Sequence, residues 1–158
     1  MTFHSISTLS HIATQRVEVP ANVAFDYLAD PMKLGRWSLG CFDTRPGSAQ
    51  DIYSGTSLYD GAPAWFRITG DRSRGWVDFH LGTPDRLIPR ISARIVPGGH
   101  VDLPDHSCLV SLIAWRSSAM DDARWQRLCA AHEAEIWLIK MQIERDHGEQ
   151  RENNGPVG

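Results

Sequence analysis

The chain has 158 residues, and 42% of them are apolar, which favours one globular domain that folds without a metal or a disulfide. Its 16 basic and 19 acidic side chains leave a formal net charge of −3. This balance argues against a nucleic-acid binder, because contacts to phosphates need a clustered basic excess. The sequence predicts no signal peptide and no membrane span, so we expect a cytoplasmic protein without integral membrane contact.

The first forty residues predict one strand and two short helices. Side chains alternate over residues 11–19, which is typical of a strand. Apolar residues then follow helical spacing over residues 21–30. Asp30 and Pro31 begin a second short helix, because Asp is a good N-cap and Pro suits the first helical position. We expect Trp37 to end this second helix.

A series of short β segments, separated by Gly and Pro turn signals, fills the middle of the chain. Segments joined so closely form antiparallel hairpins, because a parallel crossover needs a dozen or more residues. The predicted strands lie near residues 41–45, 51–59, 64–70, 75–81, 87–96 and 107–116.

A long amphipathic helix is predicted after these strands. Asp121 is placed to cap it, and Met120 is placed to pack on Trp125 one turn inside. Residues at steps of three and four form an apolar stripe that must lie on the sheet. The stripe is Trp125, Leu128, Cys129, His132, Ile136, Ile139 and Ile143. The face expected in solvent carries Arg124, Arg127, Ala131, Glu135, Gln142 and Glu149.

This order of elements, together with two sequence segments, resembles the START-like (SRPBCC) helix-grip superfamily. That superfamily includes polyketide cyclase/dehydrase-like, pollen-allergen-type and lipid-transfer domains. The first segment starts at Val19-Pro20-Ala21, continues as Phe25-Asp26-Tyr27-Leu28-Ala29-Asp30-Pro31 and ends at Gly35-Arg36-Trp37-Ser38. The second is the helix ending Ile139-Lys140-Met141-Gln142-Ile143-Glu144.

The resemblance implies an α+β fold with a seven-stranded antiparallel curved sheet. Two short helices after strand 1 and the sheet would wrap around the long C-terminal helix. We expect one domain over residues 10–146, and flexible tails over residues 1–9 and 147–158, where apolar periodicity is absent. In this superfamily the gap between sheet and helix holds hydrophobic or amphipathic small molecules.

Alternation within the sheet separates an aliphatic face from an ionic face. A symmetric turn over residues 70–75 would pair Arg67 with Asp78 across the strands. We expect the aliphatic face under the helix, because burying several charges is costly. The alternative turns Asp78, His80 and Arg94 inward as an acid/base cluster. The aliphatic set is Phe66, Ile68, Val77, Phe79, Leu81, Ile91, Ala93 and Ile95. The ionic set is Trp65, Arg67, Trp76, Asp78, His80, Arg90, Ser92 and Arg94.

These placements predict a ligand pocket on the aliphatic face. His132 is the polar group on the helix stripe, and it is either a ligand anchor or a buried structural histidine. The residues expected around the pocket are Trp37, Phe66, Phe79, Ile91, His132 and Ile136.

The leading hypothesis for function is binding of a small hydrophobic or amphipathic molecule in this pocket, without a cofactor. One alternative is a cyclase/dehydratase-type enzyme that acts on a polyketide-like substrate through cavity acid/base residues. A second is an interaction module that uses the Trp65/Trp76 face to bind a partner or to form a homodimer. No catalytic residue is assigned from the sequence.

No metal site is expected, because no set of metal ligands has usable spacing. The loop with His100, Asp102, Asp105 and His106 is interpreted as a solvated hairpin tip. Cys41, Cys108 and Cys129 are odd in number and widely spaced, so we expect small core side chains rather than a disulfide framework.

Overall fold

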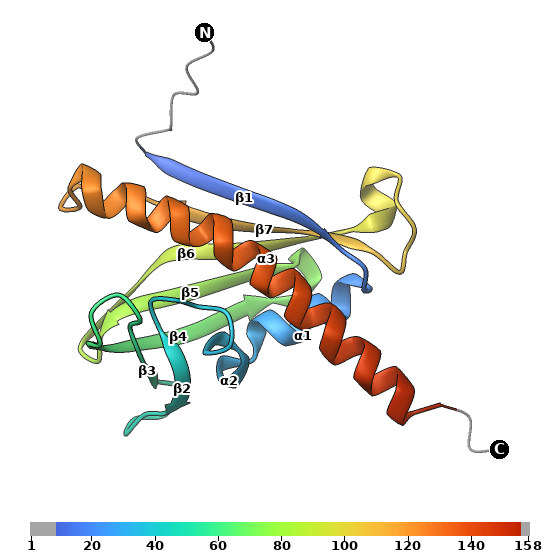
Figure 1. Cartoon of the computed structure of the whole chain (residues 1–158), viewed down its shortest axis with the longest axis horizontal. Helices are drawn as coiled ribbons and strands as arrows, with labels where there is room; N and C mark the ends of the chain where they lie inside the picture. Colours follow the sequence, from blue (N-terminus) through green and yellow to red (C-terminus); the bar gives the residue numbers. More distant parts are fainter. Residues whose placement is uncertain (1–8, 156–158) are drawn as a thin grey trace, which may run out of the picture.

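A computed structural model describes residues 9–155, which form one antiparallel sheet, short helices and one long helix (Figure 1). The strands are β1 (Ser10–Val17), β2 (Phe42–Pro46), β3 (Tyr53–Thr56), β4 (Pro63–Asp71), β5 (Trp76–Thr83), β6 (Arg86–Pro97) and β7 (Cys108–Trp115). The α-helices are α1 (Ala21–Ala29), α2 (Pro31–Leu34) and α3 (Asp122–Asn153). Two 3₁₀ turns are η1 (Arg72–Arg74) and η2 (Gly98–Val101).

The sheet has the strand order β1-β7-β6-β5-β4-β3-β2, so the first strand of the chain pairs with the last one. The two short helices connect β1 to β2, and α3 crosses one face of the sheet along β1 and β7 (Figure 1). The predicted α+β helix-grip architecture is thereby confirmed. None of the helices within residues 9–155 is long and apolar enough to cross a membrane.

The predicted helix starts are confirmed by side-chain caps. The carboxylate of Asp30 accepts a hydrogen bond from the backbone N–H of Met32 at 2.9 Å, with Pro31 in the first turn of α2. Asp121 accepts from the backbone N–H of Arg124 at 2.8 Å. Each cap satisfies an N–H group that has no partner inside its helix.

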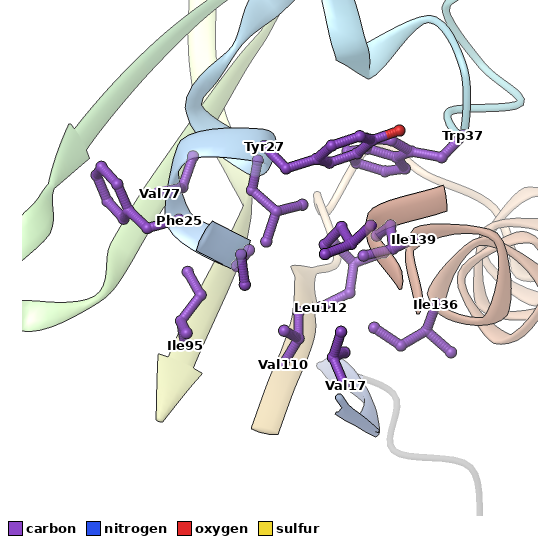
Figure 2. Close-up of a cluster of buried hydrophobic side chains, with 14 of the residues drawn as sticks. Val17, Phe25, Tyr27, Trp37, Val77, Ile95, Val110, Leu112, Ile136 and Ile139 are labelled. Atoms are coloured by element: carbon purple, nitrogen blue, oxygen red, sulfur yellow. The ribbon is translucent and has the colours of Figure 1, made fainter. Parts of the chain in front are cut away.

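The core lies between the sheet, α1 and α3 (Figure 2). From α3, Ile136, Ile139 and Ile143 are almost completely buried, and the aromatic rings of Trp37 and Phe79 meet edge to face with centroids 5.5 Å apart. A second cluster at the start of α3 joins Met120, Trp125, Cys129 and Ala114, with Leu128 partly buried beside it. The predicted apolar stripe is therefore confirmed. Cys41, Cys108 and Cys129 are buried free thiols, as expected.

The helix α3 is longer than the sequence predicts. It continues to Asn153, seven residues past the expected domain boundary at 146, so residues 147–153 are helical. Lys33 and Arg36 both form ion pairs with Asp146, at 2.9 and 3.3 Å, and these hold the preceding turn. Helix propagation costs little once a turn is fixed, so the loss of apolar periodicity does not end the helix. Residues 1–8 and 156–158 of the predicted tails lie outside the described residues.

The β4–β5 hairpin has a register that differs by two residues from the predicted one. Arg67 lies opposite His80 rather than Asp78. The turn is η1, closed by Gly75 in the left-handed region (φ 63), and Asp71 accepts a hydrogen bond from the backbone N–H at the end of η1. A shift of two residues keeps every side chain on its predicted face.

Candidate functional site

A cavity of about 320 Å³ lies between the N-terminal half of α3 and one end of the sheet. Its walls come from the loop after α2, the β3–β4 hairpin loop, the start of β4, strands β5 and β6, and α3. Ligand cavities in proteins are of this size or larger. Its apolar wall includes Leu81, Ile91, Met120 and Leu128. Its polar groups include Tyr59, Asp60, Arg90, Arg124, Arg127, His132 and Glu135.

Two buried polar side chains of α3 line this cavity. His132 and Glu135 are three residues apart, so they lie one above the other on the same side of the helix. Their exposed fractions are 3% and 5%. This corrects the prediction for the solvent face of α3, since Glu135 and Ala131 are both buried. The loop after α2 and the β3–β4 loop cover this side of the helix.

Burial raises the pKa of Glu135 from 4.5 to about 8. The backbone N–H of Leu39 donates a hydrogen bond that lowers this pKa, but by less than burial raises it. The carboxyl is therefore mostly protonated at neutral pH, and it can donate a hydrogen bond there.

His132 is held neutral in the same wall. Burial, with a smaller effect of His11, lowers the pKa of His132 from 6.5 to about 4. The two imidazole rings meet edge to face with centroids 6.0 Å apart, and Nε2 of His11 lies 2.9 Å from Oε1 of Glu133. Within residues 9–155, the buried Nδ1 atom of His132 makes no hydrogen bond. A buried neutral histidine and a buried neutral carboxylic acid therefore stand one turn apart.

Arg90 enters the cavity because β6 contains an irregularity. Phe79 pairs with Ile91, but Leu81 pairs with Ile88, so His80 alone opposes two residues of β6. Such a bulge re-aims side chains that regular alternation would place on the other face. Arg90 was predicted on the ionic outer face, and the structure corrects this: it lines the cavity. Its Nη1 atom is buried and has no hydrogen-bond partner among the described residues.

The rim of the cavity is built by the β3–β4 loop and α3. The guanidinium of Arg127 lies 4.8 Å from the centre of the Tyr59 ring, a cation–π contact between α3 and the β3–β4 loop. Burial and the nearby Glu135 raise the pKa of Tyr59 above its ordinary value. Asp60 accepts a hydrogen bond from the backbone N–H of Ala62 at 2.9 Å, which closes the loop and lowers the pKa of Asp60.

The structure brings two of the six predicted pocket residues to this cavity. Ile91 and His132 line it. The other four are buried in the core outside its lining, with Trp37 packed on Phe79; these four are Trp37, Phe66, Phe79 and Ile136. The cavity therefore lies nearer the start of α3 than the sequence predicts.

The sequence predicts His132 at the pocket but not the other polar residues of the cavity, although two signals pointed to Glu135 and Arg90. Glu135 follows Leu128 by seven residues and precedes Ile139 by four, a spacing that fits the buried side of a helix. Pro89 within a predicted strand is typical of a bulge or an edge, and it precedes Arg90 directly. Tyr59 and Arg127 carry no comparable signal, because a loop and a helix rim meet only in three dimensions.

Side chains on the ionic face of the sheet form hydrogen bonds with one another. Asp78 accepts from Nε1 of Trp76 at 2.8 Å and from the hydroxyl of Ser92, instead of pairing with Arg67. Trp65 and Trp76 are half-buried, and Trp65, predicted on the outer face, lines the cavity. The register places Trp65 six residues along β4 from the partner of Trp76. That offset corresponds to about 20 Å, so the two rings do not form one patch.

All four possible metal ligands in the loop between β6 and β7 are exposed, as expected for a hairpin tip. Over residues 9–155 no group of three or more His, Cys, Asp or Glu residues is placed to hold a metal ion.

Comparison with solved structures identifies the fold. The chain is similar to the Zhui aromatase/cyclase from Streptomyces sp. R1128, with TM-score 0.61, 14% identity, 86% of this chain and 93% of that one covered. A START superfamily protein from Mycobacterium smegmatis gives TM-score 0.61 at 11% identity, over 87% and 98% of the two chains. The di-domain ARO/CYC BexL from the BE-7585A biosynthetic pathway gives TM-score 0.62 at 15% identity, over 85% of this chain and 46% of that one.

At these identities the similarity concerns the fold. The chain has the START-like helix-grip fold that these aromatase/cyclases and the START superfamily protein also adopt, as the sequence resemblance implied. No protein-family model matches the chain, and no curated protein matches it.

Proposed function

We propose that this protein binds a small amphipathic molecule in the cavity beside the first half of α3. Two observations carry the proposal: His132 lines this partly apolar space, and its buried Nδ1 atom makes no hydrogen bond to any described residue. A buried polar atom without a partner costs about 1–3 kcal/mol, and a ligand oxygen would remove that cost. The apolar wall at Ile91 and Leu128 would hold the rest of the ligand.

Replacement of His132 by leucine tests this proposal. Prodan, a neutral naphthalene ketone whose fluorescence reports its surroundings, serves as the oxygen-bearing probe. His132→Leu should weaken prodan binding by about 1–3 kcal/mol, because the imidazole offers its hydrogen bond to the ketone. The fold should persist, because leucine suits the apolar stripe of α3. His106→Leu, in the exposed hairpin tip, is the matched control and should bind like the unmodified protein.

Two results would contradict the proposal. One is unchanged prodan affinity in a folded His132→Leu variant, which would make His132 a structural histidine. The other is the absence of any prodan binding by the unmodified protein. Native mass spectrometry of protein purified without denaturation would add the mass of a ligand retained from the cell.

A second candidate function is acid/base catalysis on a polyketide-like substrate, and the protonated Glu135 favours it. A carboxylic acid held neutral by burial is a group that can give a proton to a substrate oxygen. Two of the structural neighbours are aromatase/cyclases. Turnover of a poly-β-ketone substrate that is lost in Glu135→Gln, with binding retained, would support catalysis.

A further inference from the structure

The lining of the cavity carries more positive than negative charge. Among the lining residues, Arg90, Arg124 and Arg127 carry permanent positive charge, and Asp60 is the carboxylate that stays ionised at neutral pH. Glu135 is mostly protonated there, and its neutral carboxyl offsets none of this charge. The cavity is therefore a site of positive potential in which an organic anion gains electrostatic stabilisation.

Arg90 is the cavity arginine whose charge is least compensated by the surrounding protein. Burial lowers the pKa of its guanidinium, and Arg124 on the neighbouring helix lowers it further by charge repulsion. No carboxylate of the described residues forms an ion pair with Arg90, and its Nη1 atom is buried without a hydrogen bond. Two guanidiniums that approach each other beside an apolar wall form a place for an oxyanion.

We propose that the cavity selects an amphipathic organic anion, whose oxyanion binds between Arg90 and Arg124 while its apolar body lies against Ile91 and Leu128. This inference rests on the proposed function and adds the charge class of the ligand. Carboxylates, sulfonates and phenolates share the required chemistry.

Binding of such an anion is coupled to the protonation of Glu135. Its carboxyl accepts a hydrogen bond from the Leu39 N–H in the loop after α2 and lies close enough to Tyr59 to raise the pKa of that phenol. Cys41 from the loop after α2 and Asp60 from the β3–β4 loop line the same cavity. The charged or titratable groups that share the cavity from α3 and β6 are Arg124, Arg127, His132 and Arg90. His132 is already neutral above pH 6, and burial raises the pKa of Tyr59 above its ordinary value, so Glu135 is the lining carboxyl that ionises between pH 7 and 9. Its ionisation adds a negative charge that repels a bound anion.

A matched pair of fluorescent probes tests the charge class. 8-Anilinonaphthalene-1-sulfonate is an anion, and N-phenyl-1-naphthylamine has the same ring system without the sulfonate. Arg90→Gln should weaken binding of the anion about 10- to 100-fold and change binding of the neutral probe less than about twofold. Arg67→Gln removes a guanidinium outside the cavity lining and should change neither affinity. Circular dichroism establishes that each variant is folded.

The outcomes separate this inference from the proposed function. Equal effects of Arg90→Gln on both probes, or no effect on either, would overturn the anion preference while the cavity remains a binding site. Failure of the unmodified protein to bind either probe would contradict both proposals.

A pH series gives the second arm of the test. Affinity for the sulfonate probe should be constant near pH 6–7 and should fall severalfold by pH 9, because Glu135 ionises while the sulfonate does not titrate. Glu135→Gln should remove this decrease. An equal decrease in the variant and the unmodified protein would overturn the coupling to Glu135.

Discussion

Replacement of Ile136 by alanine is expected to lower the free energy of unfolding by about 2–5 kcal/mol, as measured by urea denaturation. Ile136 is 1% exposed and lies in the core where α3 packs against the sheet. The change removes buried methyl and methylene groups and leaves a cavity that the surrounding side chains fill only in part. Because α3 is one long helix laid over the sheet, a void at its centre weakens the whole domain.

Met141→Ala is the control for this experiment. Met141 lies on the same helix with 65% of its side chain exposed, so its truncation should change the free energy of unfolding by less than about 0.5 kcal/mol. A loss below 1 kcal/mol at Ile136 would contradict the packing described for α3.

Glu135→Gln is expected to make the protein more stable above pH 8, by as much as about 5 kcal/mol, which is the free energy that corresponds to a pKa rise from 4.5 to about 8. In the unfolded chain Glu135 ionises near pH 4.5, whereas in the folded protein it keeps its proton until about pH 8. The folded state therefore binds more protons between these values, and stability falls as the pH rises through them. Below pH 4.5 both states are protonated, and the two proteins should be equally stable.

The measurement is a set of denaturation curves for both proteins from pH 4 to pH 9. Glu149→Gln, at an exposed position near the end of α3, is the control and should follow the unmodified protein at every pH. A stability difference between Glu135→Gln and the unmodified protein that does not grow from pH 5 to pH 8 would show that Glu135 is ionised in the folded state.

The fold was predictable because its signals are local. Turn residues mark the hairpins, Asp30 and Asp121 mark helix starts, and an apolar stripe marks the buried side of α3. These patterns act over three to ten residues, which is the range over which spacing reports secondary structure. The β4–β5 register was less predictable, because it depends on where a 3₁₀ turn begins and on Gly75 rather than on alternation.

The cavity was predictable only in part, because its polar residues come from elements whose relative placement is a tertiary property. The position of His132 at the cavity is predicted by the helical period of α3, and that of Ile91 by strand alternation. The burial of Glu135 depends on two loops that fold over the helix, and no pattern on α3 alone states which polar residues will be covered. The position of Arg90 depends on the bulge in β6, which interrupts the strand alternation used to predict its face.

The extra residue in β6 affects how the charge of the cavity can change during evolution. Deletion of Pro89 would leave Ile91 opposite Phe79 and Ile88 opposite Leu81, with one residue between them on each strand. Regular alternation would then return the guanidinium of Arg90 to the outer surface. One codon gained or lost at this point thus changes the positive charge of the binding chamber by one, with the ladder on either side intact. Homologues that differ in length here are expected to differ in the charge of the molecules they take up, even where their remaining side chains agree.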